Sequence, residues 1–136
     1  MGGKQVGQRR TAQREAIMNV INATDGPLTV EQIRDRASKK SPNLGIATVY
    51  RTVKLLLDGE QIHAVILPDG ETRYEAADLD HHHHFRCRGC NVVFDLPGCM
   101  MPIPEGTALP GGFCVEDHEI TLFGTCPECT ASNSPA

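Results

Sequence analysis

The chain has 136 residues, of which 40% are hydrophobic and 22% are charged. A chain of this length forms one ordinary domain or two small ones with thin cores, and its composition is that of a globular protein rather than a disordered one. It has no apolar run long enough to cross a bilayer, and the N-terminus MGGKQVGQRR lacks the apolar core of a signal peptide, so we expect a cytoplasmic protein.

The net charge of -4 conceals an uneven distribution along the chain. Residues 1–60 carry ten Lys or Arg and six Asp or Glu, a balance of +4, whereas residues 61–136 carry three and eleven, a balance of -8. Every histidine and every cysteine lies in the acidic part. The pattern indicates a basic module, suited to an anionic partner such as DNA, joined to an acidic module rich in metal ligands.

Three helices are predicted in the basic part. The first begins with Thr11 as its cap and ends near Asp-Gly-Pro at 25–27. The second opens with a capping-box pattern, Thr29 followed by Gln32, and stops before Ser41-Pro42. The third runs over about 46–57. Their buried stripes are predicted to contain Ala12, Ala16, Ile17, Val20, Ile21, Val30, Ile33, Ala37, Ile46, Val49, Val53 and Leu56.

A β-hairpin is predicted next, because two extended runs at 62–67 and 71–75 flank the turn Pro-Asp-Gly. Three short helices followed by a hairpin predict a winged-helix DNA-binding domain over residues 1–76, whose third helix enters the major groove. The side chains of that helix that lie outside its apolar stripe, and are therefore the candidate DNA contacts, are Thr48, Tyr50, Arg51 and Lys54.

The acidic part predicts a different architecture. Residues 91–96 and 119–123 alternate as strands do, and Phe85 is expected in a third strand. The stretch between them, PGCMMPIPEGTALPGGF, is expected to be mostly loop, and the last seven residues are expected to be frayed. The predicted class is α+β, with residues 81–136 as a small metal-binding domain that has an antiparallel sheet and a four-cysteine zinc site, joined to the first domain by residues 77–80.

Two C-x-x-C pairs, Cys87 with Cys90 and Cys126 with Cys129, give the clearest chemical signal. Four thiolates delivered as two such pairs can close a tetrahedral zinc site, and a reducing cytoplasm favours this over disulfides. The zinc would support a domain too small to bury enough apolar surface. Cys99 and Cys114 lie outside the pairs, and Cys99 is a candidate additional ligand.

The run HHHHFRCRGC places four histidines directly before the first cysteine pair. Side chains alternate between the two faces of an extended strand, so His81 and His83 point one way while His82 and His84 point the other. One strand could therefore supply ligands to two sites.

GIATVYRTVKLLLDGEQI, GETRYEAADLDHHHHFRCRGC and HEITLFGTCPEC together resemble the ferric uptake regulator family of bacterial metal-responsive repressors. The resemblance covers roughly residues 8–130. It implies a homodimer that binds an AT-rich palindrome in operator DNA and closes its two DNA-binding domains when regulatory metal binds at the hinge. It also implies that Tyr50 and Arg51 contact DNA and that the four paired cysteines hold structural zinc.

The resemblance further implies two regulatory metal sites. The hinge sensor would use Glu75, His82 and His84, with His63 at a wing position where zinc-sensing members place an aspartate. A second site in the dimerisation domain would use His81, His83 and His118, together with Glu105.

Two departures from the family pattern bear on the effector. Pro27 stands where iron and peroxide sensors have a histidine, and four histidines stand where those sensors often have a run containing a carboxylate. An imidazole-rich set of ligands suits zinc or ferrous iron, with nickel and manganese as further candidates. The alternatives are a peroxide-sensing regulator of the same family, a zinc-dependent hydrolase or a metal store. A deaminase lacks support because no Glu lies two residues after a histidine of the run.

Overall fold

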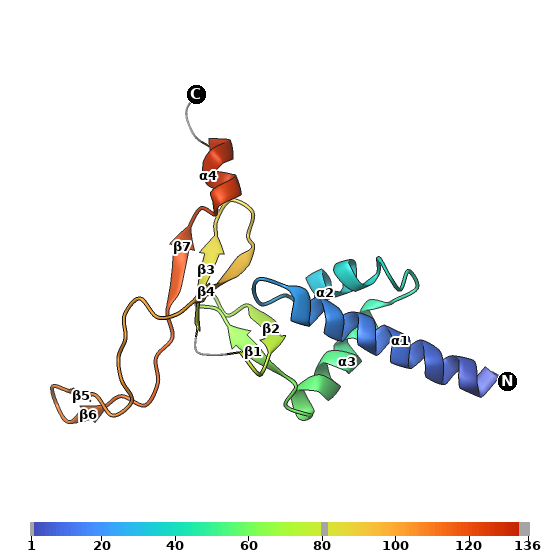
Figure 1. Ribbon diagram of the computed structural model, residues 1–136, viewed down its shortest axis with the longest axis horizontal. Coiled ribbons are helices and arrows are strands. Elements are labelled where there is room, and N and C mark those ends of the chain that lie inside the picture. The colour runs from blue at the N-terminus through green and yellow to red at the C-terminus, as the bar shows by residue number, and fades with distance from the viewer. Residues whose placement is uncertain (1, 80–81, 134–136) are drawn as a thin grey trace. The chain divides into compact units, whose positions relative to one another are not determined.

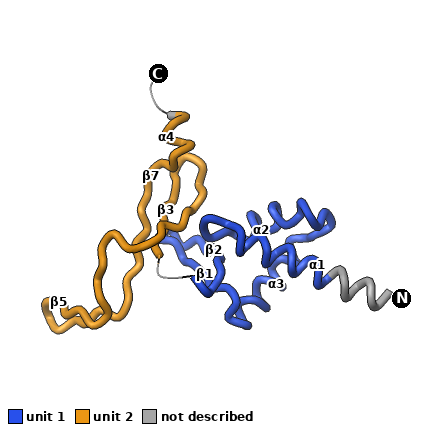
Figure 2. Tube along the Cα trace, in the orientation of Figure 1, with its two compact units in different colours: residues 1–79 blue, residues 80–136 orange. Residues whose placement is uncertain are grey.

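The computed structural model describes residues 2–79 and 82–133, with side chains from residue 10 onward. It divides into two compact units, Met1–Leu79 and Asp80–Ala136 (Figure 2). No helix among the described residues is long and apolar enough to cross a membrane. The predicted hinge, residues 77–80, remains a prediction.

Unit 1 contains three helices followed by a hairpin (Figure 1). The helices are α1 (Gly2–Ala23), α2 (Val30–Ala37) and α3 (Ile46–Asp58), and the hairpin consists of β1 (Ile62–Ile66) and β2 (Thr72–Ala76), which pair antiparallel. Leu28 and Tyr74 exchange backbone hydrogen bonds of 3.0 and 2.8 Å, which join the α1–α2 connection to the hairpin. This order of elements is that of a winged helix.

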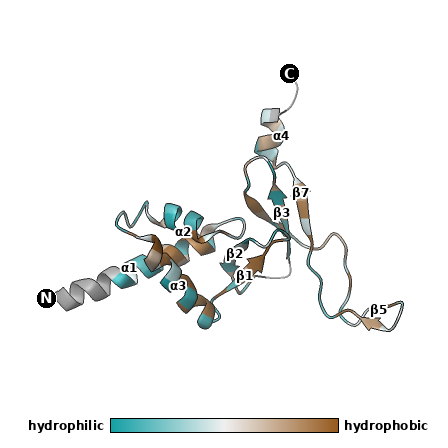
Figure 3. Ribbon diagram, turned by 180° about the vertical axis from the view of Figure 1, so that it is seen from behind, coloured by the Kyte–Doolittle hydropathy of each residue, from teal (hydrophilic) through white to brown (hydrophobic). Residues whose placement is uncertain are grey.

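The core of unit 1 comes from the predicted helical stripes and the hairpin, and Figure 3 shows hydrophobic and hydrophilic stretches on the same helices. Ile46 is only partly buried at its edge, and Ala12 is exposed. The buried residues of this core are Ala16, Ile17, Ile21, Leu28, Val30, Ile33, Ala37, Leu44, Val49, Val53, Leu56, Ile62 and Ala76.

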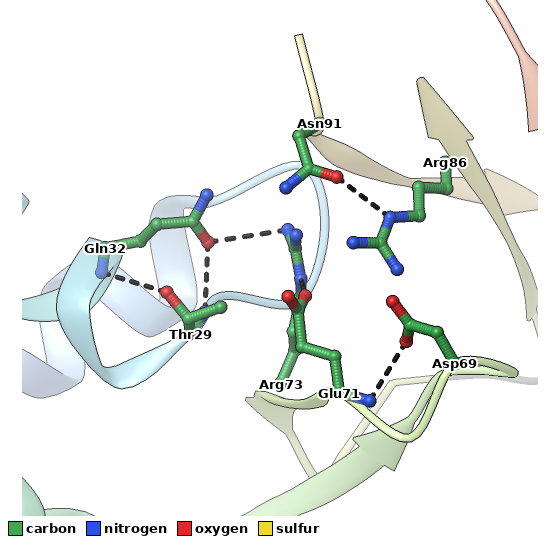
Figure 4. A network of polar contacts seen from close by, with 7 residues as sticks. All are labelled: Thr29, Gln32, Asp69, Glu71, Arg73, Arg86 and Asn91. Atoms are coloured by element: carbon green, nitrogen blue, oxygen red, sulfur yellow. Dashed lines mark hydrogen bonds and ion pairs between the residues drawn. The ribbon is translucent and has the colours of Figure 1, made fainter. Parts of the chain in front are cut away.

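The predicted capping box of α2 is confirmed. The Gln32 N–H donates to Thr29 Oγ1 over 3.1 Å, and the Thr29 N–H donates to Gln32 Oε1 over 3.0 Å. Gln32 Oε1 also accepts from Arg73 Nη1 over 3.5 Å, and Arg73 Nε donates to Glu71, so the wing is tied to the start of α2 (Figure 4). The prediction that the first helix starts at Thr11 is wrong, because helical backbone already begins at Gly2. Lys, Gln and Arg at positions 4, 5 and 8–10 are good helix formers, and the helix extends through them past the potential cap although Gly2, Gly3 and Gly7 disfavour it.

Unit 2 is built on a three-stranded sheet of order β4-β3-β7. The strands are β3 (His82–Cys87), β4 (Val93–Pro97) and β7 (Thr121–Gly124). β3 and β4 pair antiparallel as predicted, but β3 and β7 pair parallel, so the sheet is mixed. The chain crosses between β4 and β7 through a long loop that contains a short hairpin, β5 (Ala108–Leu109) with β6 (Phe113–Cys114). The chain runs down β4 and back along β7 on the other side of β3, so β7 is parallel to β3, and the expectation of a purely antiparallel sheet is wrong.

The chain ends in α4 (Pro127–Asn133), part of which the sequence led us to expect as frayed. Pro127 occupies its first position, where a missing N–H costs nothing. Residues 134–136 lie outside the described part of the chain.

Replacing Thr29 with Ala should lower the free energy of unfolding by about 1 kcal/mol, because the Gln32 N–H loses its acceptor at the start of α2. Chemical denaturation followed by circular dichroism measures the change. Thr29→Ser keeps the hydroxyl and serves as the control. Equal stability of the Ala and Ser variants would show that the cap contributes nothing.

Candidate metal centres and DNA-binding surface

The structure brings the two C-x-x-C pairs together. Cys87 ends β3, Cys90 lies in the turn that follows, Cys126 directly precedes α4, and Cys129 lies in its first turn. Their ligand atoms lie within 4.8 Å of one another, and the sulfurs of Cys90 and Cys126 are 3.9 Å apart. Four sulfurs at this spacing fit a tetrahedral zinc site.

Backbone N–H groups favour a thiolate at the centre of this cluster. The N–H groups of Cys126 and Cys90 point at Cys87 Sγ over 3.3 and 3.5 Å, and these hydrogen bonds lower the pKa of Cys87 to about 6. Side-chain hydrogen bonds with Cys87 and Cys126 raise the pKa of Cys129 to about 12. Without a cation the cluster therefore retains protons, and a dication supplies the charge that lets all four sulfurs be thiolates.

A second group of donors lies on one face of β3. His82 and His84 point the same way, as the alternation predicts, with ring centroids 4.9 Å apart. Asp95 of β4 lies opposite His84, and its Oδ1 is 3.2 and 3.4 Å from the Nε2 atoms of His82 and His84. This oxygen is buried and lies near both rings, but neither ring makes a hydrogen bond to it. An unsatisfied carboxylate oxygen facing two imidazoles fits a metal centre.

In unit 1, the two predicted hinge ligands form a pair across the hairpin. His63 on β1 and Glu75 on β2 are register partners, with His63 Nε2 2.7 Å from Glu75 Oε1. The Glu75 side chain is 3% exposed and that of His63 is 45% exposed. The pair offers one carboxylate and one imidazole.

A third group lies on the opposite face of β3. His83 is buried there with Cys99 and His118, and the ligand atoms of these three lie within 4.8 Å of one another. Within the described residues this group does not include Glu105, which is exposed on the loop before β5. His81, the remaining predicted ligand, lies outside the described residues.

The third helix presents the predicted DNA contacts on its outer side. Tyr50, Arg51 and Lys54 are exposed, and Thr48 is half-buried, where its Oγ1 accepts from Arg51 Nη2 over 3.2 Å. Tyr50 OH donates to Glu31 over 3.4 Å, and the charge of that carboxylate raises the pKa of Tyr50. The phenol therefore stays protonated at neutral pH.

A concavity of about 680 Å³ lies between α1 and α3 and carries three arginines. Arg10 and Arg14 come from α1, one helical turn apart, and Arg51 comes from α3. Three guanidinium groups around one hollow form a site suited to phosphate oxygens.

Sequence reasoning missed Asp95, the close approach of Cys99 to two histidines, and the arginines of α1. An acidic residue inside the apolar run VVFDL was a usable signal for Asp95, and Arg10 with Arg14 at helical spacing was one for the concavity. For Cys99 the sequence offers only a free cysteine, since its partners, His83 on β3 and His118 before β7, are distant in the chain.

Comparisons with known proteins agree with this architecture. The model of the Ferric uptake regulator family matches residues 5–123. The chain is 30% identical to a Ferric uptake regulation protein of Campylobacter jejuni over 93% of this chain and 82% of that protein. It is 29% identical to a Zinc uptake regulation protein of Mycobacterium tuberculosis over 90% of this chain and 95% of that protein. A solved structure of a zinc-bound manganese uptake regulator is 27% identical, covers 84% of this chain and 87% of its own, and has a TM-score of 0.68.

A winged helix joined to a small sheet with a cluster of four cysteines and imidazole-rich ligand groups defines a transcriptional regulator of metal homeostasis. The chain belongs to the Ferric uptake regulator family. It is accordingly a regulator and not an enzyme.

Gly89→Ala should weaken zinc retention by the four cysteines. A Cβ at this position would lie 2.9 Å from Cys129 Sγ, so the sulfur must move out of the cluster. Zinc transfer from the purified protein to a chelating dye measures the effect, and the variant should release zinc several-fold faster. Gly45→Ala is the matched control, because a Cβ there meets nothing within 4 Å. Equal release rates for the two variants would contradict this assignment of the cluster.

Proposed function

We propose that this protein is a zinc-responsive repressor that acts in the cytoplasm as a homodimer on an AT-rich palindromic operator, with ferrous iron as the alternative effector. The observation that carries the proposal is the group of His82, His84 and Asp95, in which a buried carboxylate oxygen faces two imidazoles. Two neutral nitrogens and one carboxylate suit a borderline dication such as zinc.

We propose that the sensor site also uses His63 and Glu75 of unit 1. Their pairing across the hairpin makes an imidazole and a carboxylate available together. The resemblance to the family implies hinge ligands at these positions, which supports this part of the proposal. The site would then draw ligands from both sides of residues 77–80.

Ligands from two units give the sensor its mechanism. When His63 and Glu75 bind the same ion as His82 and His84, the units are held in one arrangement, and that arrangement gains population at the expense of others. The bound ion would supply the positive charge that attracts these four donors to one point. A coupling of about 1 to 3 kcal/mol is typical and alters operator affinity several-fold to a hundredfold.

The four cysteines have a separate role in the proposal. We propose that they hold structural zinc, which keeps β3 and the start of α4 together whatever the state of the sensor. The donor set supports zinc, because thiolates disfavour hard cations such as magnesium and four sulfur donors match the tetrahedral coordination of structural zinc.

DNA binding is assigned to α3 together with α1. Tyr50 and Arg51 are exposed on α3, the helix that would enter the major groove in a winged helix, and this supports the assignment. Arg10 and Arg14 add positive charge beside Arg51 and are assigned to phosphate contacts. Regulators of this family bind operator DNA as dimers, so one palindromic half-site is expected for each subunit.

Replacing both His82 and His84 with Ala should abolish metal-dependent operator binding while leaving the cysteine-bound zinc in place, because only the sensor donors are removed. Electrophoretic mobility shift with titrated zinc, iron, nickel and manganese measures the first effect, and elemental analysis measures the second. The same titration on wild-type protein also identifies the effector metal.

Glu75→Gln should weaken the same metal response, since the carboxylate charge is lost, whereas Glu60→Gln should not, because Glu60 is an exposed residue after α3. Unchanged operator affinity in the double histidine variant would rule out the sensor site. A normal response of the Glu75 variant would restrict the site to unit 2.

Arg51→Ala should lower operator affinity by about 1 to 3 kcal/mol, and Arg14→Ala should reduce the salt dependence of binding by about one counterion. Fluorescence anisotropy with labelled operator at several salt concentrations measures both. Lys39→Ala, which alters an exposed charge after α2, is the control. If Arg14→Ala leaves the salt slope unchanged, the concavity does not contact phosphate.

A further inference from the structure

A carboxylate contacts the proposed DNA-binding helix of unit 1, where negative charge is unfavourable. Glu31 lies in the first turn of α2, and its Oε1 accepts a hydrogen bond from Tyr50 OH of α3 over 3.4 Å. Both residues are exposed, Tyr50 by 53%. Arg51 and Lys54 line the same hollow as Tyr50, so Glu31 contacts a helix surface that otherwise carries positive charge.

The position of Glu31 suits the helix but does not by itself require this contact. A carboxylate in the first turn of a helix is stabilised by the helix dipole wherever its side chain points. The side chain reaches α3 because α2 and α3 share one core, in which Val30, Ile33 and Val49 are buried. The contact between Glu31 and Tyr50 therefore depends on a packed pair of helices and not on a loop.

The contact decides what the phenol can offer to a base. A tyrosine hydroxyl has one proton to donate and lone pairs that accept. Because a carboxylate only accepts, the proton of Tyr50 OH is directed at Glu31, and the lone pairs of the phenol oxygen remain for another donor. In the major groove adenine presents an N6 amino donor and cytosine an N4 amino donor, whereas guanine O6 and thymine O4 are acceptors.

We propose that Glu31 is a positioning residue that determines specificity, because it holds Tyr50 as a hydrogen-bond acceptor, so that α3 reads an exocyclic amino group of adenine or cytosine in the major groove. The inference rests on the proposed function, in which α3 is the recognition helix. Guanine or thymine at the same position places an acceptor against the phenol oxygen, and two desolvated acceptors without a proton between them are unfavourable. Glu31 acts through Tyr50 and does not touch the base.

Two effects of Glu31 on DNA binding oppose each other. Its charge repels phosphates and lowers affinity for every sequence, by about twofold for a unit charge roughly 8 Å away in water. Its hydrogen bond lowers affinity only for sequences that present the wrong group, by about two- to tenfold for one hydrogen bond. The 3.4 Å separation is longer than that of a strong bond to a carboxylate, so the contact is weak in the free protein, and the exclusion of water by DNA strengthens it.

The test compares full-length variants on one operator. The operator is the duplex that wild-type protein enriches from a random-sequence library in the presence of zinc or ferrous iron. Each adenine in it is replaced in turn by purine, which lacks the 6-amino group, and each cytosine by 2-pyrimidinone, which lacks the 4-amino group. Fluorescence anisotropy gives the ratio of affinities for the natural and the substituted duplex. Because protein variants are compared on the same duplexes, the altered base pairing cancels.

Wild-type protein should lose about two- to tenfold in affinity at one adenine or cytosine of each half-site, and Tyr50→Phe should show a ratio near one there. Glu31→Ala should also bring the ratio near one, while it binds every duplex about twofold more tightly because a negative charge is removed. Tighter binding with poorer discrimination is not the result of a merely structural defect.

Two further variants separate the hydrogen bond from the charge. Glu31→Gln keeps an oxygen that accepts from the phenol and should restore the ratio. Asp35→Asn is the matched control, because it removes an exposed charge of the same helix that pairs with Arg34 and not with Tyr50. It should leave the ratio unchanged.

A second measurement tests the contact without DNA. The charge of Glu31 raises the pKa of Tyr50, so Glu31→Ala and Glu31→Gln should both lower that pKa towards its ordinary value. The chain has two tyrosines, and nuclear magnetic resonance of protein labelled at tyrosine Cζ follows each one through a pH titration. Tyr50→Phe identifies the signal of Tyr50.

An unchanged ratio in Glu31→Ala, or an unchanged pKa of Tyr50 in that variant, would overturn the inference. So would an operator in which no adenine or cytosine gives a ratio that Tyr50→Phe alters. Failure of the proposed function is distinguishable, because wild-type protein would then enrich no duplex in response to metal, and the inference would fall with it.

Discussion

The folded state of the second unit depends on the cluster of four cysteines, Cys87, Cys90, Cys126 and Cys129. Unit 1 buries a continuous apolar core, but the buried apolar residues described for unit 2 are Val93 and two of the clustered cysteines, Cys87 and Cys126. A sheet of three short strands with so little buried surface has almost no hydrophobic stabilisation of its own. Zinc held by the sulfur atoms at the end of β3 and the start of α4, as we propose, would supply the stabilisation that this core lacks. It would also fix the strand that carries the histidines.

Local signals in the sequence were sufficient for the first unit. Helical spacing identified the residues that α2 and α3 bury, and the Thr29–Gln32 pattern located the start of α2, because both depend on neighbours within one or two turns. The start of α1 is the exception in this unit: Thr11 can cap a helix, but the helix continues through the Lys, Gln and Arg residues before it.

The candidate sites were predictable only to the extent that they depend on local geometry. The spacing of the cysteines and the alternation of the histidines follow from a turn and a strand, and both are present in the structure. Asp95 and Cys99 join the histidines through strand pairing and through the turn at Gly98, which no short stretch of sequence encodes. The parallel pairing of β7 escaped notice for the same reason, since it depends on a long crossover.

β3 is a six-residue strand whose successive side chains face opposite groups of donors and whose last residue belongs to the cysteine cluster. Its length is therefore constrained in a way that the crossover loop is not. Insertion of one residue within β3 would move every histidine before it to the opposite face of the sheet. A histidine that faces Asp95 would then face Cys99, and the reverse. A change of length between Cys99 and His118 would leave this alternation intact, whereas a change of length within β3 would not.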